Sequence, residues 1–235
     1  EGIKIFQISH DSPAWARKDK ITNAAPDDLR DVYNYAKAAA KHFKGKVSAW
    51  EFWNEPDIAF FRYPSSECAA LQKAAFLGMK DGNKGMKVLG PSMAMMSQFE
   101  WNLIDNETGS YMDIWNYHVY ANPDDYVARA DHFREVLAKH NVKLPMWVTE
   151  AGDPFAEGAN GVLEKDAFNH QARFLSRGIP QGIAAGVDRH YYFVFPFYHE
   201  GSHGWGLFGE GNKYPYAGLA ALSNVSYALG QGKFL

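Results

Sequence analysis

The segment VSAWEFWNEPD, residues 47–57, has the composition of a buried strand that ends abruptly in polar residues. Val, Trp and Phe are enriched in strands, and Pro56 ends regular pairing because it has no backbone N–H to donate. Asn54 and Glu55 stand side by side just before that proline. A carboxylate at the mouth of a strand is costly unless it is solvated, paired or used in chemistry. The segment therefore predicts a strand whose carboxyl end carries function.

The same pattern, a short apolar strand followed by an amphipathic helix, occurs six times along the chain. Regular βα alternation is typical of a parallel sheet covered by helices, and the absence of a GxGxxG motif after any strand argues against a dinucleotide-binding sheet. Because no composition break separates the units, residues 1–235 are expected to form a single α/β domain, a (β/α)-barrel of the TIM type. The expected strands span residues 3–9, 47–53, 87–92, 112–120, 144–150 and 189–197.

The carboxyl ends of these strands carry polar residues, and a (β/α)8 barrel places its functional groups at those ends. The polar residues are His10, Glu55, Ser92, His118, Tyr120 and Glu150. Two carboxylates that face each other across a barrel mouth suit glycosidic bond cleavage. In that reaction one carboxyl group protonates the leaving oxygen while the other attacks the anomeric carbon or activates water.

The overall composition limits the kinds of molecule that this protein is expected to bind. A net charge of −3 over 235 residues gives no reason to expect nucleic acid or an anionic membrane surface, and no apolar run reaches the length of about 20 residues that spans a bilayer. The 7 Trp, 13 Tyr and 16 Phe residues exceed what a core alone usually needs, and aromatic side chains suit the flat apolar faces of sugar rings. The single cysteine, Cys68, excludes an internal disulfide.

Several motifs together resemble those of glycoside hydrolase clan A, the retaining (β/α)8 glycosidases. WNEP at 53–56 pairs with WVTEAG at 147–152, and HVY at 118–120 resembles the clan's strand 6 motif. SPAWA (12–16), GPS (90–92) and GLFGEGNKYPYAGLAAL (206–222) resemble family 39 and its relatives, and the chain as a whole is closest in pattern to family 39 and family 5 relatives. The resemblance covers nearly the whole chain and implies a retaining hydrolase that acts by double displacement on an oligo- or polysaccharide, without a cofactor.

The resemblance also implies roles for individual residues. Glu55 would be the general acid/base and Glu150 the nucleophile, with Tyr120 bonded to Glu150. Asn54 would bond the sugar 2-hydroxyl, and His118 would line the site near the acid/base. A non-catalytic carbohydrate-binding relative is the alternative, and an extracellular or periplasmic location is favoured by the resemblance alone.

Other candidates for substrate contact have an equally ordinary structural explanation. His10 is either a site residue or a loop histidine with its own partners. Trp15, Trp53 and Trp205 would stack on sugar rings, although any single Trp is more often part of the packing. Clan members usually end strand 8 in a Trp, whereas this chain reads YYFVFPFY, so the expected replacements are Phe195, Phe197 or Tyr198.

The mapping assigns the six visible strands to barrel positions 3 to 8, so the barrel is expected to be N-terminally incomplete. Strands 1 and 2 would come from an upstream segment, a second chain or a partner protomer. Without them the strands near Ile5 and Phe193 would be open edges, which favour aggregation.

Two further motifs are expected to have a structural role rather than a catalytic one. HEGSH at 199–203 matches the H-E-x-x-H zinc pattern, which needs a helix to bring both His onto one face. Gly201 and the preceding strand make a helix improbable, so no metal site is expected there. Glu51 lies on the same strand face as Glu55 but deeper, and a buried structural charge with a basic partner such as Arg189 is expected.

Overall fold

The computed structural model describes residues 3–156 and 165–230. The chain divides into two compact units, each described here by itself. The first comprises Glu1–Tyr117 and His132–Pro145, and the second comprises His118–Asp131 and Met146–Leu235. None of the described helices is both long and apolar enough to cross a membrane.

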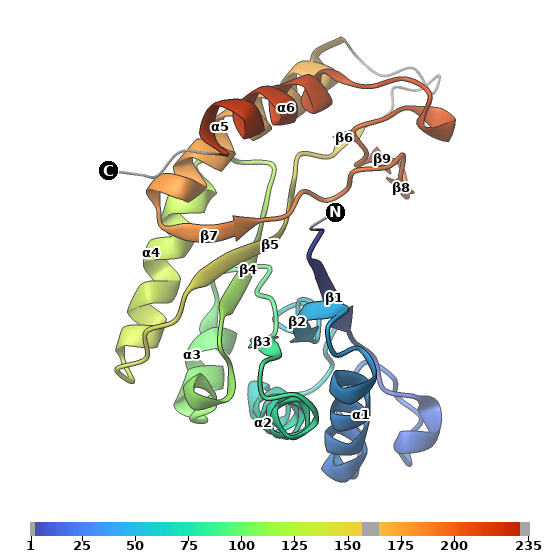
Figure 1. Ribbon diagram of the computed structural model, residues 1–235, viewed down its shortest axis with the longest axis vertical. Helices are drawn as coiled ribbons and strands as arrows, with labels where there is room; N and C mark the ends of the chain where they lie inside the picture. The colour runs from blue at the N-terminus through green and yellow to red at the C-terminus, as the bar shows by residue number, and fades with distance from the viewer. Residues whose placement is uncertain (1–2, 157–164, 231–235) are drawn as a thin grey trace. The chain divides into compact units, whose positions relative to one another are not determined.

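The first unit is built on a three-stranded parallel sheet with the order β1-β2-β3 (Figure 1). Ile8 pairs with Glu51, and Glu51 with Leu89, so the register places Glu51 in the middle of the sheet. Its strands and main helices are β1 (Ile5–Ser9), α1 (Leu29–His42), β2 (Val47–Phe52), α2 (Ser65–Gly82) and β3 (Lys87–Leu89).

Helix α1 forms where the sequence supplies both a cap and an apolar stripe. The Asp28 side chain accepts from the backbone N–H of Arg30 at 2.9 Å, which satisfies one of the donors that a helix start leaves open. Ala36 and Ala40, one turn apart, are buried. After the helix ends, Gly45 takes a left-handed conformation with φ of 79°.

Helices α1 and α2 pack closely because two glycines of α2 face the α1 backbone. A Cβ atom at Gly78 would lie 2.3 Å from the carbonyl oxygen of Tyr33, and one at Gly82 would lie 2.3 Å from that of Lys37. Such distances are shorter than any van der Waals contact, so a larger residue would force the helices apart. The two glycines, one turn apart, therefore set the spacing of this helix pair.

The rest of the first unit extends from β3 toward the start of β4. Ser97 and Glu100 form a reciprocal capping box at the start of α3. Parallel bridges join Leu89 to Ile114 and Met93 to Tyr117. The remaining short elements of this unit are η1 (Ala14–Ala16), α3 (Gln98–Asp105) and η2 (Thr108–Tyr111).

A second three-stranded sheet has the order β4-β5-β7, with β5 and β7 parallel. The unit boundary falls within β4 and again within α4. Helices α5 and α6 pack at Gly218, where a Cβ atom would lie 2.2 Å from the Gln171 side-chain oxygen. The elements are β4 (Trp115–Tyr120), α4 (Asp125–Ala138), β5 (Met146–Gly152), α5 (Lys165–Ala184), β7 (Val187–His190), η3 (Glu210–Asn212) and α6 (Ala217–Leu229).

The second unit also contains a small antiparallel sheet that the sequence pattern did not predict. It has the order β6-β9-β8, from β6 (Phe155–Ala156), β9 (His203–Gly204) and β8 (His199–Glu200). The HEGSH stretch is thus a hairpin that turns at Gly201, whose φ is 59°. The prediction that this stretch is not helical is confirmed, and the zinc-protease geometry cannot form on it.

All six predicted strands are present, each connected to a helix, and the α/β class with parallel strands is confirmed. The last strand is shorter than expected: it spans Val187–His190 rather than 189–197. Tyr191 N and Phe193 N still donate to Val148 O and Ala151 O of β5, whereas Val194 N donates to Trp205 O and Leu207 N donates to Phe195 O. The number of strands in a complete barrel stays a prediction.

Candidate active site

Glu55 follows β2 on a turn with unusual backbone geometry. Trp53 and Glu55 both have positive φ, 82° and 44°, a region that residues other than glycine rarely occupy. The Glu55 side chain is mostly buried, with 9% of the residue exposed. Its backbone N–H donates to Ser92 Oγ at 3.3 Å. Such local strain persists only where the surroundings over-determine the conformation, and it is common at functional sites.

Glu51 lies beneath this turn and is fully buried. Its two carboxylate oxygens accept from Ser92 Oγ at 2.9 Å and from Asn116 Nδ2 at 2.5 Å. Arg189, the basic partner suggested by the sequence, belongs to the second unit, where its guanidinium lies 4.7 Å from the centre of the Trp147 ring. Glu51 is thus buried, as predicted. Its carboxylate is hydrogen-bonded by the Ser92 hydroxyl and the Asn116 side-chain amide.

Asp57, just after the proline, ties the turn to the loop after β3. Its carboxylate accepts from the backbone N–H groups of Ala94 at 2.9 Å and Met95 at 2.7 Å. Burial raises the pKa of Asp57, and the two backbone donors oppose that rise. The turn after β2 and the loop after β3 are thus bonded to each other at more than one point.

A cavity of about 530 Å³ in the first unit brings three predicted substrate residues together: His10, Trp15 and Trp53 all line it. Trp15 is 71% exposed, as a platform for a sugar ring would be. Trp53 is only 2% exposed, and its indole N–H donates to Phe60 O at 2.9 Å. Trp15 and His10 are therefore the accessible members of this group, and Trp53 is chiefly part of the wall.

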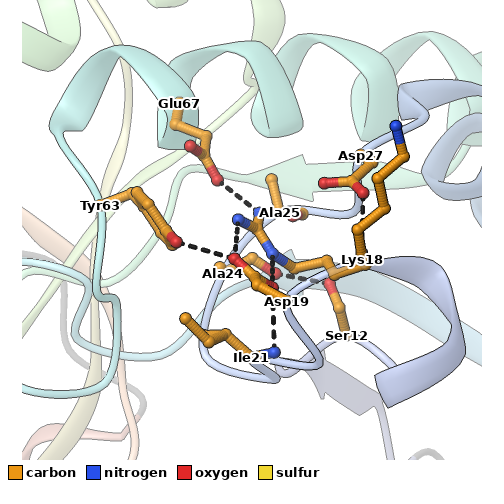
Figure 2. A network of polar contacts seen from close by, with 10 residues as sticks. Ser12, Lys18, Asp19, Ile21, Ala24, Ala25, Asp27, Tyr63 and Glu67 are labelled. Atoms are coloured by element: carbon orange, nitrogen blue, oxygen red, sulfur yellow. Dashed lines mark hydrogen bonds and ion pairs between the residues drawn. The ribbon is translucent and has the colours of Figure 1, made fainter.

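The loop that carries Trp15 is anchored by Arg17, and Figure 2 shows the Asp19, Tyr63 and Glu67 side chains of this network. The guanidinium donates two hydrogen bonds of 2.9 Å to Asp19 and one of 3.0 Å to Glu67 at the start of α2. Tyr63 donates to Asp19 at 2.9 Å. Because of the Arg17 hydrogen bonds, the pKa of the Asp19 carboxyl lies well below its usual range. This network fixes the loop to α2 and so shapes the cavity.

In the second unit, Glu150 lies in β5 beside its predicted partner Tyr120 and beside His118, which was expected near the acid/base. Tyr120 donates its phenol to Glu150 Oε2 at 2.5 Å, and His118 Nδ1 lies 3.5 Å from the same oxygen. The side chain of Glu150 is 23% exposed, whereas that of His118 is 1% exposed. A short phenol bond stabilises the ionised carboxylate and fixes its direction. The arrangement suits a carboxylate that attacks an electrophile.

Aromatic rings surround Tyr120 on this side. The ring of Trp205 lies 5.1 Å from that of Tyr120, centre to centre, and the ring of Phe193 lies 6.3 Å away. The Gly of TEAG, Gly152, is required here because a Cβ atom would lie 2.5 Å from Phe193 O. Trp205 therefore lies beside Tyr120, the partner of the candidate nucleophile, and its stacking on a sugar ring stays a prediction.

The three aromatics expected in place of the usual strand 8 Trp have different neighbours. Phe195 packs against Phe208 and Phe197 against His199. The ring of Tyr198 lies 5.7 Å from that of Phe193, centre to centre, and the Tyr198 carbonyl oxygen accepts from Trp205 N at 3.0 Å. Phe193, which the sequence did not single out, contacts Tyr120. Which of these aromatics replaces the Trp stays a prediction.

The sequence profile of the glycosyl hydrolase catalytic core matches residues 18–211. The chain belongs to this family. The match spans both the turn with Glu55 and the strand with Glu150, so both candidate carboxylates lie in the glycosyl hydrolase core. No curated protein sequence matches the chain significantly.

The fold of the glycosyl hydrolase core is similar to that of several solved glycoside hydrolases, and a family 39 enzyme is among them, as the resemblance implied. A family 39 glycoside hydrolase from the gut symbiont Bacteroides cellulosilyticus matches with a TM-score of 0.70 and 19% identity, over 89% of this chain and 47% of that one. Xylanase 10B from Thermotoga maritima matches with 0.63 and 18%, over 85% and 66%. A family 128 endo-β-1,3-glucanase from Amycolatopsis mediterranei matches with 0.58 and 17%, over 94% and 82%.

The chain spans less than half the length of two of these relatives, 47% of the family 39 enzyme and 42% of a glucosidase from Croceicoccus marinus. At this level of identity the likeness establishes the fold. The roles of individual residues rest on their own geometry.

The predicted site residues of the glycosyl hydrolase core form three groups. Asn54 and Glu55 lie on the turn after β2, and Ser92 Oγ is 3.4 Å from Asn54 Oδ1. His10, Trp15 and Trp53 line the cavity of the same unit. His118, Tyr120, Glu150 and Trp205 belong to the second unit.

Some residues were missed by sequence reasoning. Asn116 and Asp57 were not singled out, although both bond the segments around Glu55. Asn116 is two residues before His118 and shares its strand face, so alternation along β4 was an available signal. Asp57 lies past the proline, where no periodicity applies, and only the fold reveals its partners.

Proposed function

We propose that this glycosyl hydrolase core is catalytic and hydrolyses a glycosidic bond in an oligo- or polysaccharide with retention of configuration. Glu150 is the nucleophile and Glu55 the general acid/base. Asn54 bonds the sugar 2-hydroxyl, and Tyr120 and His118 orient Glu150. His10, Trp15 and Trp205 contribute contacts to the sugar rings.

The reaction takes two steps. In the first, a Glu150 oxygen attacks the anomeric carbon, the bond from that carbon to the leaving oxygen breaks, and the proton of Glu55 passes to that oxygen. In the second, the Glu55 carboxylate takes a proton from water while the water oxygen attacks the anomeric carbon and releases Glu150. Each carboxyl group returns to its starting state.

The observation that carries the proposal is the 2.5 Å hydrogen bond from Tyr120 to Glu150. A phenol that donates to a partly exposed carboxylate favours its ionised form and holds one oxygen still. A purely structural carboxylate would more often be paired with a cation or turned to solvent. The profile match, which covers this strand, supports the same assignment.

The substrate class follows from what the similar proteins are named for. They include a xylanase, β-xylosidases and an endo-β-1,3-glucanase. The exposed Trp15 and the cavity beside it are compatible with a pyranose ring stacked on an indole. We therefore propose β-linked xylose or glucose units as the substrate.

The test uses the full chain with para-nitrophenyl β-xyloside and β-glucoside, and with xylan and laminarin as polymers. Glu150→Ala should lower kcat by at least about 1000-fold, because the covalent step loses its nucleophile. Glu55→Ala should be slow with water but faster with added azide, because azide needs no general base. The matched control is Glu135→Ala, which removes an exposed acid on α4 and should leave the rate unchanged.

Near-normal turnover by Glu150→Ala would disprove the assignment. Wild-type chain that binds these glycans and releases no product, measured by calorimetry beside the activity assay, would favour the non-catalytic carbohydrate-binding alternative.

A further inference from the structure

The turn that carries Glu55 holds two residues in a conformation they do not favour. Trp53 and Glu55 have φ of 82° and 44°, and the second of them is the proposed acid/base. For residues with a Cβ atom the left-handed region is disfavoured, so the turn keeps this shape only through contacts from outside it. Those contacts determine where the Glu55 carboxyl group points.

Ser92, which follows β3, contacts the turn at both of these residues. Its backbone N–H donates to Trp53 O at 3.3 Å, and its Oγ accepts from Glu55 N at 3.3 Å. The two bonds lie on either side of Asn54. Ser92 thus forms hydrogen bonds with the first and last residues of the strained WNE segment, although it lies 37 residues after Glu55 in the chain.

The Ser92 hydroxyl is itself held in one orientation. Ser92, Glu51 and Asn116 are each 0% exposed. The hydroxyl donates its single proton to Glu51 Oε1 at 2.9 Å, the nearer of two acceptors, since Asn54 Oδ1 lies at 3.4 Å, and Asn116 Nδ2 bonds the other oxygen of that carboxylate at 2.5 Å. Because the proton is committed to Glu51, a lone pair of Oγ is left to receive the Glu55 N–H. Glu51 therefore orients the serine, and the serine restrains the turn.

We propose that Ser92 is a positioning residue that, oriented by Glu51, keeps the Glu55 carboxyl in the direction required for proton transfer. The inference rests on the proposed function, in which Glu55 is the acid/base. It assigns Ser92 no contact with substrate. Loss of the hydroxyl should leave substrate binding intact and impair the proton transfer from Glu55 to the leaving group.

The test compares Ser92→Ala with Thr108→Val in the full chain. Thr108 is a matched control because it is fully buried in the same unit and donates its hydroxyl to Leu103 O at 2.8 Å, away from the turn. For each variant, kcat and KM are measured on a para-nitrophenyl glycoside and on the corresponding dinitrophenyl glycoside. The dinitrophenyl group leaves readily without a proton, whereas the poorer leaving group needs the acid.

Ser92→Ala should lose kcat/KM, which reports formation of the glycosyl-enzyme, about 10-fold or more on the para-nitrophenyl glycoside and much less on the dinitrophenyl glycoside. Thr108→Val should show no such difference between the two substrates. An equal loss of rate on both substrates, or the same pattern in both variants, would mean that Ser92 has only a structural role. An inactive wild type would instead refute the proposed function.

A second measurement does not depend on activity. Hydrogen exchange of the Glu55 amide should be about 10-fold faster or more in Ser92→Ala than in wild type, because its acceptor is gone, while Thr108→Val leaves that amide protected. An unchanged rate of hydrogen exchange at the Glu55 amide would contradict the proposed role of Ser92, whatever the kinetics show.

Discussion

At the scale of single residues, burial keeps His190 neutral at the end of β7. Its Nε2 contacts the Tyr126 hydroxyl, and the two rings stack at 5.4 Å. Burial lowers the pKa of His190 from 6.5 to about 4, because the charged imidazolium would lose its hydration. Between these two values the unfolded chain binds a proton that the folded chain does not. Stability from this group is therefore present above pH 6.5 and is lost as the pH falls toward 4.

We expect His190→Gln to flatten this part of the pH–stability curve. In wild type, the group should account for up to about 3 kcal/mol of unfolding free energy lost between neutral pH and the lower pKa. Urea unfolding at a series of pH values measures the difference between variant and wild type. His42→Gln, which changes an exposed histidine in α1, is the control. Parallel curves for wild type and His190→Gln would show that His190 titrates normally.

The proposed acid/base depends at this same scale on single atoms. Ser92 Oγ and the carboxylates of Glu51 and Asp57 bond the residues or loops around Glu55. Each of these bonds joins groups that are close in space and distant in sequence. The surroundings of one carboxyl group are thus set jointly by the β2 segment and the loop after β3.

At the scale of elements, the pairing of α1 with α2 depends on Gly78. A methyl group there would lie 2.3 Å from Tyr33 O and 3.0 Å from the Ala36 Cβ. Backbone atoms cannot move aside as a flexible side chain would, so the two helices must separate. This cost outweighs the gain in helix propensity, which favours Ala over Gly by about 1 kcal/mol.

Gly78→Ala should therefore destabilise the fold by about 1 to 3 kcal/mol, measured by denaturant unfolding. Gly85→Ala is the control, because the new methyl group would meet only the Asn83 side chain at 3.5 Å. A neutral or stabilising effect at Gly78 would show that α1 and α2 do not pack at the spacing described.

At the scale of the whole molecule, the stereochemistry of hydrolysis reports on both units at once. Glu55 belongs to the first unit and Glu150 to the second. Retaining enzymes hold the two carboxyl groups about 5 to 5.5 Å apart, and inverting enzymes hold them farther apart to admit a water molecule. The anomer formed first is thus a readout of how the complete enzyme arranges the two acids.

We expect retention, so the first product in a proton NMR time course should have the anomeric configuration of the substrate. Mutarotation then produces the other anomer slowly. Addition of methanol should yield a methyl glycoside of the same configuration, since the glycosyl-enzyme can be intercepted by other nucleophiles. Initial release of the opposite anomer would exclude the double displacement and the role of Glu150 as nucleophile.

The sequence alone determined the order and type of the elements and the two candidate carboxylates. Hydrophobic alternation and the βα rhythm are local properties, and they located all six strands. Glu55 and Glu150 could be named because their motifs are contiguous, and because strand ends are where a parallel α/β fold presents functional groups. Tyr120 could be named as the partner of Glu150 through its motif, and the structure confirms that contact.

Only the tertiary structure decided the length of the last strand, the aromatic beside Tyr120 and the partners of Glu51. Tyr191 and Phe193 still bond to β5, after which the segment bonds to residues 205–207, and the ring of Phe193 lies beside that of Tyr120. Glu51 lies between Ser92 and Asn116, which are 41 and 65 residues away. Such partners are chosen by the geometry of packed segments, because a hydrogen bond depends on a few tenths of an ångström that no local pattern of residues encodes.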